Sequence, residues 1–397
     1  MSAHPPVTVI AEPSREAALA AWRDGLAGDD VLVVLDPAWP EGIRDAALGL
    51  VEQARTAGTL AGRDLVVFTS GSSGRPRAIH RTRRSWELSA RQFADLLGLT
   101  SHDVVAIPGP LASTLFAFGA WHGLFTGCRV IAVSVDGLRE HPAARDVSVV
   151  HAVPAMLPML FSLRRDARLP ALRVVVVAGD ALAPGAAEEG ARLGLRIIEY
   201  YGAAELSFVG IRDASADASG PLRPFPGVEV EVRDGVLWSR SSYQMRDYLG
   251  VSGPVRRDAL GWATVGDLAS GDAAGFVVRG RGDAAVTTGG HTVVVEEVEQ
   301  FLRRLPGVAD AGVTGLPHAR LGQRVVAVVQ PYDGALDVNA LRAACLALPA
   351  AARPRAFVRA DVPRAATGKI LRADLRAVAA HGVAAQHSAP WPGERAS

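Results

Sequence analysis

The chain has 397 residues, of which 49% are hydrophobic and 21% are charged, and its formal net charge is +1 at pH 7. This length predicts two or three domains, and the balance is typical of a globular protein with a sizeable core. Acidic and basic residues are mixed along the chain, without the basic stripe of a nucleic-acid binder. We therefore expect no nucleic-acid partner.

The two cysteines, Cys128 and Cys345, lie far apart in apolar stretches. This placement favours small core residues over a disulfide bond or a metal site. The N-terminal stretch lacks the basic start and apolar run of a signal peptide. No apolar run approaches the roughly 18 residues that a membrane span needs. We expect a cytoplasmic protein without a membrane span.

Short β-branched runs alternate with alanine-rich helical stretches up to residue 200. Apolar strands separated by helices indicate a mostly parallel sheet that is covered on both faces. Helices are expected over residues 83–97 and 184–193. The predicted strands are residues 31–35, 65–68, 104–107, 129–133, 147–153, 172–177 and 195–200.

Beyond residue 200 the pattern changes twice. Short strands joined by Asp-Gly and Gly-rich turns predict a small antiparallel sheet or barrel. From about residue 284, strands and amphipathic helices predict a compact α+β unit. The expected fold class is α/β, with a large domain of mostly parallel sheets, helices and the small antiparallel sheet, followed by a small α+β domain. The predicted boundaries are 1–282, a hinge at Asp283, 284–385 and a loose tail at 386–397.

A candidate anion-binding loop lies in "VVFTSGSSGRPRAIHRT", residues 66–82, where an apolar run enters a Ser/Gly-rich segment. Glycines let backbone N–H groups converge and hydroxyls add donors, so the loop could cradle a polyphosphate. No Gly-Lys-Ser/Thr follows, which excludes a Walker loop. Arginines downstream favour an anion, although a turn beside a solvated basic face fits equally. The loop residues are Thr69, Ser70, Gly71, Ser72, Ser73 and Gly74, with Arg75, Arg77, Arg81, Arg83 and Arg84 beyond.

A second candidate stretch is "IIEYYGAAELSFVG", residues 197–210, at the end of a predicted strand. Open α/β sheets bind ligands at the carboxyl ends of their strands. Tyr201 could stack on a base, and Glu205, which we expect at the start of a helix, could hold a hydrated Mg²⁺. The alternative for Glu205 is favourable pairing with the helix dipole alone.

Two polar residues stand out between the second and third parts of the chain. Asp267 follows a predicted strand, where a carboxylate could grip a ribose diol, and Arg281 could meet ribose or phosphate. Asp283 lies where the pattern changes and is a natural hinge. A set of ordinary polar turns explains the same residues.

The stretch "RAATGKILRAD", residues 364–374, contains Lys369, the single lysine of the chain, against 41 arginines. A surface position that needs only a positive charge accepts either residue. The retention of one lysine therefore indicates a specific role over a solvated loop residue.

In this order, the four stretches resemble the adenylate-forming superfamily, which comprises acyl- and aryl-CoA synthetases, adenylation domains of nonribosomal peptide synthetases and luciferases. The matches are "TSGSSGRPR" to the phosphate loop, "YGAAE" to the adenine and Mg²⁺ motif, "TVGD" to the ribose aspartate, "GRGD" to the hinge and "PRAATGK" to the catalytic-lysine motif. The resemblance covers about residues 65–375. The C-terminal part is also similar to the compact o-succinylbenzoyl-CoA synthetases.

The resemblance implies a two-step reaction that uses ATP, Mg²⁺ and CoA or a phosphopantetheine thiol. A carboxylic acid attacks the α-phosphate and forms acyl-AMP, and a mobile C-terminal domain then turns about Asp283 so that the thiol can attack. Lys369 and Glu205 would be the catalytic residues, with Glu205 holding Mg²⁺ through water. The implied nucleotide-binding residues are Gly179, Asp180, Ala181, Tyr200, Tyr201, Gly202, Ala204, Asp267 and Arg281.

The acyl pocket implied by the resemblance contains small and aromatic residues, which suggests an apolar or aromatic acid. Its candidates are Ser113, Phe116, His151 and Ala203, for which core packing is the alternative. Arg77 and Thr287 replace lysines of the family, Ala204 and Ala365 replace threonines, and the first subdomain is shortened.

Three functions remain open from the sequence. The leading one is an acyl- or aryl-CoA ligase. A stand-alone adenylating enzyme that passes the acyl group to a carrier protein or another nucleophile is the first alternative. A non-catalytic nucleotide-binding relative is the second, because Arg77 and Ala204 depart from the motifs.

Overall fold

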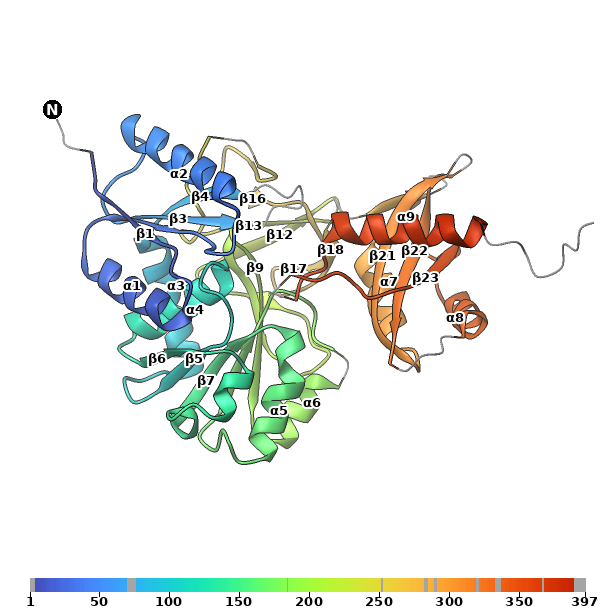
Figure 1. Cartoon of the computed structure of the whole chain (residues 1–397), viewed down its shortest axis with the longest axis horizontal. Coiled ribbons are helices and arrows are strands. Elements are labelled where there is room, and N and C mark those ends of the chain that lie inside the picture. The colour runs from blue at the N-terminus through green and yellow to red at the C-terminus, as the bar shows by residue number, and fades with distance from the viewer. Residues whose placement is uncertain are drawn as a thin grey trace, which may run out of the picture. The chain divides into compact units, whose positions relative to one another are not determined.

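The computed structural model describes residues 4–69, 76–183, 185–250, 253–281, 285–288, 291–318, 321–332, 337–365 and 368–388. The chain forms two compact units (Figure 1). The first comprises Met1–Val265, Gly271–Val277 and Ala366–Gly368, and the second comprises Gly266–Ser270, Val278–Ala365 and Lys369–Ser397.

The first sheet has the strand order β1-β2-β3-β4-β14. Strands β1 to β3 are parallel, whereas β4 runs antiparallel to both β3 and β14. The candidate phosphate loop therefore connects two antiparallel strands, and β4 was not among the predicted elements. The strand bounds are Val7–Ile10, Val31–Val34, Asp64–Thr69, Arg77–Thr82 and Asp247–Tyr248.

The second sheet has the order β11-β10-β9-β8-β7-β5-β6. The strands β5, β6, β7, β8 and β9 pair in parallel, which confirms the predicted parallel sheet. Strands β10 and β11 add an antiparallel edge. In chain order from β5 the bounds are Val104–Ile107, Arg129–Ala132, Val147–Ala152, Val174–Val177, Arg196–Ala203, Ser207–Asp213 and Arg223–Pro224.

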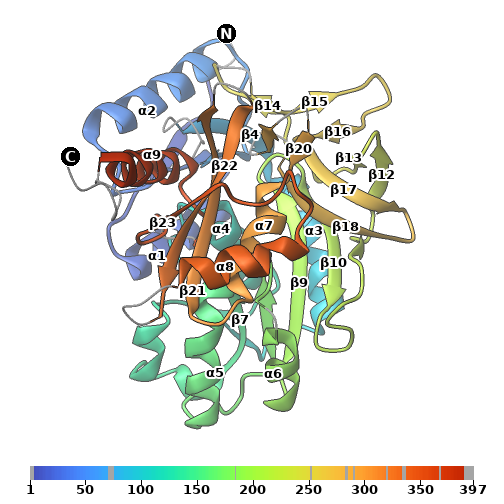
Figure 2. The ribbon, with the colours of Figure 1, turned by 90° about the vertical axis from the view of Figure 1, so that its right-hand side faces the viewer.

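Helices cover these sheets as the alternating pattern predicted. α5 and α6 pack on one face of the second sheet, where their apolar side chains join one buried core (Figures 1 and 2). α4 contacts strands of both sheets and packs against α3. The bounds of α1 to α6 are Arg15–Ala27, Glu41–Thr56, Arg83–Leu97, Thr114–Phe125, Leu157–Arg165 and Ala186–Arg192.

A third sheet has the order β15-β16-β13-β17-β18, with β12 paired to β13. The pairings β12–β13, β13–β16 and β15–β16 are antiparallel, as predicted for this part of the chain. The boundary between the two units falls within β17 and again within β18. The bounds are Glu229–Arg233, Val236–Arg240, Arg256–Arg257, Ala263–Thr264, Asp267–Asp272 and Gly275–Arg281.

The second unit is built on a sheet of order β20-β19-β22-β21, with β23 paired to β22. Alternate residues of β22 face opposite layers: Val325 and Val329 pack with α7 and α8, and Val326 and Val328 pack with α9 (Figure 2). From β19 the strands are Val286–Thr288, His291–Val293, Val308–His318, Gly322–Pro331 and Ala356–Arg359. The helices are Val295–Arg303, Val338–Ala344 and Arg372–Ser388.

Two expectations about single features can be compared with the structure. Cys128 and Cys345 are buried and free, as predicted. α9 continues to Ser388, past residue 386, where the tail was expected to begin. None of the helices in the described part of the chain combines the length and apolar character needed to cross a bilayer.

Candidate active site

The candidate site of the first unit lies where parallel strands of the second sheet end. Residues 151 and 152 of β7 pair with 176 and 177 of β8, and residues 176 and 177 pair with 198 and 199 of β9. The segments that follow β7 and β8 therefore leave the same edge of the sheet, and β9 continues past this edge to Ala203. This is the edge at which open α/β sheets bind ligands.

The two ends of the candidate phosphate loop lie on adjacent strands, because Thr69 and Arg77 are partners in the β3–β4 register. The Oγ1 atom of Thr69 is buried and has no hydrogen-bond partner among the described residues. A buried hydroxyl of this kind is suited to a ligand oxygen. The other predicted loop residues, Ser70 to Gly74, lie outside the described residues.

Contrary to the expectation from the sequence, Glu205 does not begin a helix. It lies in the short turn between β9 and β10, which form an antiparallel hairpin. A Cβ atom on Gly202 would come within 2.2 Å of the Ser207 carbonyl oxygen, so this close hairpin requires glycine there. The helix-dipole alternative for Glu205 is therefore wrong.

The Glu205 carboxylate is buried and accepts a hydrogen bond of 2.8 Å from the Tyr248 hydroxyl. Burial and the Glu205 charge raise the pKa of Tyr248, and the positive charge of Arg77 opposes this rise. Tyr248 is on β14, which pairs with β4. The first sheet thus delivers Tyr248 to the carboxylate that the sequence proposed as the Mg²⁺ ligand, and it places the charge of Arg77 near the Tyr248 hydroxyl.

Arg81 is a fully buried cation in the same region. Its Nη2 atom donates to the carbonyl oxygens of Ala204, at 3.2 Å, and Tyr243, at 3.3 Å. Its Nε and Nη1 atoms have no hydrogen-bond partner within the described ranges. Burial lowers the pKa of Arg81 to about 9, although the negative charge of Glu205 acts in the opposite direction. Arg81 therefore fixes the turn that carries Glu205.

The solvated-face alternative for the arginines after the loop is wrong for two of them. Arg83, like Arg81, is buried, and it donates to the carbonyl oxygens of Gly28 and Asp30 after helix α1. Arg84 is exposed, and Arg75 lies outside the described residues. Arg83 consequently has a structural role, whereas Arg77 and Arg81 belong to the candidate site.

The predicted nucleotide-binding residues of the first unit follow β8 or lie in β9. Gly179 has φ +98° and Asp180 accepts a hydrogen bond from the Ala181 N–H at 2.9 Å, so this segment forms a tight exposed turn. Tyr201 lies edge-on to Phe276 with ring centroids 6.5 Å apart. These groups are exposed or half-buried and are therefore accessible to a ligand at the sheet edge.

The predicted acyl-pocket residues lie at the start of α4 and in the strands β7 and β9. Ser113 precedes α4 and is half-buried, and Ala203 ends β9. Phe116 is fully buried and packs so closely on Gly109 that a Cβ there would lie 1.9 Å from the ring, which favours core packing for Phe116. His151 is also fully buried.

Lys369 lies in the second unit, in a short hairpin. The Ala365 N–H donates to the Lys369 carbonyl at 2.9 Å, and the Leu371 N–H donates to the Pro363 carbonyl at 2.9 Å. Lys369 is exposed, and Gly368 before it has φ +80°. The hairpin therefore presents the lysine outward on a constrained backbone.

The remaining predicted residues belong to segments of the second unit. Asp267 begins β17 and is buried. Arg281 ends β18 and Thr287 lies in β19, but their side chains are outside the described part, as is Asp283. The predicted hinge and the ribose contact of Arg281 stay predictions.

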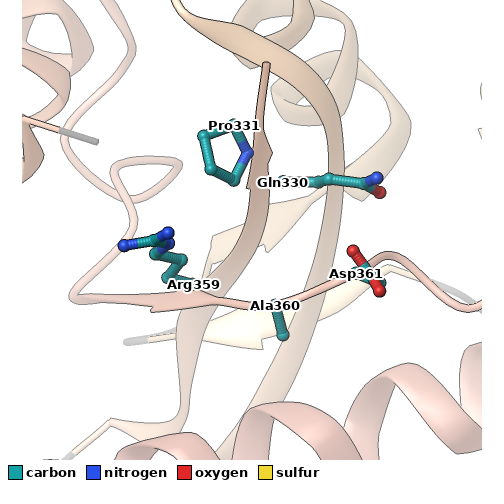
Figure 3. Close-up of a pocket in the computed structure, with 5 residues that line it drawn as sticks. All are labelled: Gln330, Pro331, Arg359, Ala360 and Asp361. Carbon is teal, nitrogen blue, oxygen red and sulfur yellow. The ribbon is translucent and has the colours of Figure 1, made fainter. Parts of the chain in front are cut away.

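A surface hollow in the second unit contains none of the predicted site residues. It is lined by Gln330, Pro331, Arg359, Ala360 and Asp361 (Figure 3). The Arg359 side chain points away from Asp361, so the hollow does not gather charges toward one ligand. It is not a candidate for the reaction site.

The chain belongs to the AMP-binding enzyme family. The family model described as AMP-binding enzyme matches residues 6–249, and the model of its C-terminal domain matches residues 297–369. Both candidate regions, around Glu205 and around Lys369, lie within these matches. The recognition made from the motifs is thereby confirmed.

Curated relatives of this chain include acid–CoA ligases. YhfT, an uncharacterized acyl–CoA ligase of Bacillus subtilis, is 31% identical over 334 residues, which span 78% of this chain and 67% of the relative. A Streptomyces salicylyl-CoA synthase / salicylate adenylyltransferase is 32% identical over 350 residues, 79% of this chain but only 63% of the relative. A probable 2-succinylbenzoate–CoA ligase of Mycobacterium tuberculosis is 32% identical over 342 residues, 78% of this chain and 83% of the relative.

Solved structures confirm the fold class. ATP-bound MatB of Rhodopseudomonas palustris matches with a TM-score of 0.79 and 21% identity, over 95% of this chain and 89% of that one. The o-succinylbenzoate CoA synthetase of Bacillus subtilis matches with a TM-score of 0.77 and 20% identity, over 94% and 87%.

The residues present fit ATP with Mg²⁺. The described residues contain no group of three or more His, Cys, Asp or Glu side chains that could hold a metal. Mg²⁺ needs no such group, because it commonly takes one or two carboxylates together with phosphates and waters. Glu205 supplies a buried carboxylate, and Thr69 supplies a buried hydroxyl at the start of the loop.

Proposed function

We propose that the protein is an AMP-forming acid–thiol ligase that activates an apolar or aromatic carboxylic acid and transfers the acyl group to CoA. The observation that carries the proposal is the gathering of Thr69, Arg77, Tyr248 and Glu205 from two sheets in a member of the AMP-binding enzyme family. Three curated relatives named above are described as CoA ligases or synthases.

In the first step, a carboxylate oxygen of the acid attacks the α-phosphorus of ATP. The bond to the bridging oxygen of the β-phosphate breaks, and pyrophosphate leaves. We assign Lys369 to the charge that builds on the α-phosphoryl oxygens, because a compact ammonium can approach oxygens of both reactants. Mg²⁺ held by Glu205 would supply further positive charge to the phosphates.

In the second step, the thiol sulfur attacks the carbonyl carbon of the acyl-adenylate. A C–S bond forms, the bond to AMP breaks, and the thiol proton passes to solvent. Small and aromatic residues near α4 support an apolar or aromatic acid. Relatives named for salicylate and 2-succinylbenzoate, both aromatic acids, support the same class.

A second acceptor has one specific observation in its favour. The Streptomyces relative is named both as a CoA synthase and as an adenylyltransferase. We therefore keep transfer to a carrier protein, or to another nucleophile, as the second candidate for the thiol step. The two candidates share the first step and differ only in the acceptor.

The test is a panel of aromatic and aliphatic acids, scored by ATP–pyrophosphate exchange and by trapping of the acyl-adenylate with hydroxylamine, with and without CoA. Exchange together with CoA thioester formation supports the CoA ligase. Exchange with negligible CoA thioester supports another acceptor. ATP binding without exchange for any acid contradicts both and leaves a non-catalytic nucleotide binder.

A further inference from the structure

Two buried histidines lie beside the predicted acyl pocket. His122 is on α4 and His151 on β7, and neither side chain is accessible to solvent. Their ring centroids are 5.8 Å apart, and the planes meet at 75°. All four ring nitrogen atoms are buried, and none has a hydrogen-bond partner in the part of the chain that the structure describes.

This lack of partners is unusual for polar groups in a core. Buried polar atoms are nearly always hydrogen-bonded, and exceptions in a native structure call for a reason. Burial lowers the pKa of His151 to about 4, and burial with the neighbouring His151 lowers the pKa of His122 well below its ordinary value. Both rings are therefore neutral near pH 7, and each offers one donor and one acceptor.

The histidines are connected to the candidate site along one face of α4. Leu115 lies next to Gly179, since a Cβ on that glycine would be 3.6 Å from Leu115 Cδ1. One turn further along α4, a Cβ on Gly119 would lie 2.8 Å from His151 Cγ, and His122 follows three residues later. The face thus runs from the strand ends at Gly179 to the histidine pair.

Aromatic rings line the same region. Phe93 has its ring centroid 5.1 Å from His122, 6.1 Å from His151 and 6.0 Å from Tyr200. Tyr200, in β9, is half-buried, so the cluster reaches from the accessible strand ends into the core. Flat apolar walls with a polar end suit an aromatic ring that carries one polar substituent.

We propose that His122 and His151 form the far end of the acyl pocket and hydrogen-bond a hydroxyl group carried by an aromatic acid at the end remote from its carboxylate. A hydroxyl both donates and accepts, so it complements one acceptor and one donor of the two neutral rings. A second carboxylate only accepts, and a methyl group does neither. This assignment rests on the proposed function and defines its substrate class.

The experiment compares acids matched in shape: 4-hydroxy- and 4-methylbenzoate, 4-hydroxy- and 4-methylphenylacetate, and the corresponding 3-phenylpropanoates, with terephthalate as the dicarboxylate. Acid-dependent pyrophosphate exchange gives kcat/KM for each. We expect the wild type to prefer the hydroxyl member of at least one pair by about tenfold or more, since a site built for a hydroxyl leaves its own groups unpaired with the methyl analogue.

Single substitutions test whether His122 and His151 cause the preference for the hydroxyl acid. His122→Leu and His151→Leu should bring the hydroxyl-to-methyl ratio close to one, and His122→Gln, which retains a donor and an acceptor, should restore part of it. Phe93→Leu is the matched control, because it contacts both rings without a polar atom, and it should leave the ratio unchanged. The Leu variants place apolar side chains among aromatic rings, and a thermal melt checks that they fold.

The outcomes separate the two proposals. No exchange with any acid contradicts the proposed function and this assignment with it. Exchange without a hydroxyl preference, a preference that survives both Leu variants, a loss caused equally by Phe93→Leu, or better use of terephthalate overturns the histidine assignment alone.

Discussion

Arg364 donates two hydrogen bonds to Asp310, from Nε to Oδ2 at 2.6 Å and from Nη2 to Oδ1 at 2.8 Å, and so ties the first leg of the Lys369 hairpin to strand β21. Burial alone would raise the pKa of Asp310, but hydrogen bonds from Arg364, its charge and that of Arg303 hold it below the ordinary value. The carboxylate is therefore ionised at neutral pH. The ion pair anchors the loop on which the candidate catalytic cation is carried.

Replacing Arg364 by Met removes both bonds while keeping an unbranched side chain. We expect acid-dependent pyrophosphate exchange to fall by about 10- to 100-fold, because small displacements of a catalytic group have effects of that order. Equilibrium binding of ATP should change little. Arg303→Met is the control, since Arg303 also donates to Asp310, at 3.1 Å, but belongs to α7. An equal loss of pyrophosphate exchange in Arg364→Met and Arg303→Met would contradict a specific role for the anchoring of the Lys369 hairpin.

Lys369→Arg retains the positive charge at an exposed position and should leave the protein folded. We expect it to lower the rate of adenylate formation by several orders of magnitude, because the planar guanidinium imposes its own geometry on two oxygens of different reactants. Pyrophosphate exchange and circular dichroism measure the two effects. Arg376→Lys, at an exposed position of α9, should behave as the wild type. Near wild-type exchange by Lys369→Arg would remove Lys369 from the mechanism.

Glu205→Gln removes the charge proposed to hold Mg²⁺. The Mg²⁺ concentration for half-maximal exchange should rise strongly, and Tyr248→Phe should raise it by about tenfold, the order expected for one hydrogen bond to a charged group. Tyr243→Phe is the matched control, because the Tyr243 hydroxyl donates instead to the Pro226 carbonyl, at 2.8 Å. An unchanged Mg²⁺ dependence in Glu205→Gln would place the metal elsewhere.

The buried histidines predict acid sensitivity of the first unit. The pKa of His151 is lowered from 6.5 to about 4 in the folded state, so the unfolded chain binds more protons between these pH values. The free energy of unfolding therefore falls as pH drops from 6.5 toward 4, by about 3 kcal/mol from His151 alone.

Denaturant titrations at pH 7 and pH 5, followed by tryptophan fluorescence, measure this loss. Six of the seven tryptophans belong to the first unit, so the signal reports mainly on it. His151→Leu should lose less stability than the wild type between the two pH values. The same loss in both proteins would show that other groups cause the acid sensitivity.

Much of the fold could be predicted because its strands are buried on both faces. Continuous apolar runs such as residues 104–107 and 174–177 became parallel strands, since helices cover both sides of the sheet. The strand from Arg77 to Thr82 was missed because it contains three charged or titratable residues within six. Two of them, His80 and Arg81, are buried; His80 pairs with Asp64 on the neighbouring strand, and Arg81 donates to the turn at Ala204, far away in sequence.

The site residues that lie within short sequence motifs could be predicted. The contacts that depend on strand pairing between distant segments were missed. Tyr248 lies 43 residues from Glu205 in sequence and reaches it only because β14 pairs with β4. The expected helix at Glu205 was wrong for a similar reason. The segment after Ala203 has no strong β pattern, yet it pairs with β9 and β11, and this tertiary pairing overrides the local propensity.

The exposed lysine on its short hairpin gives the protein one chemically distinct handle. Among 397 residues it is the single side-chain primary amine, so an amine-selective reagent can modify the hairpin and the N-terminal amino group and nothing else by that chemistry. A fluorophore or an isotopic methyl label introduced this way needs no engineered cysteine. Its signal would follow one loop through substrate binding and turnover in the otherwise unaltered chain.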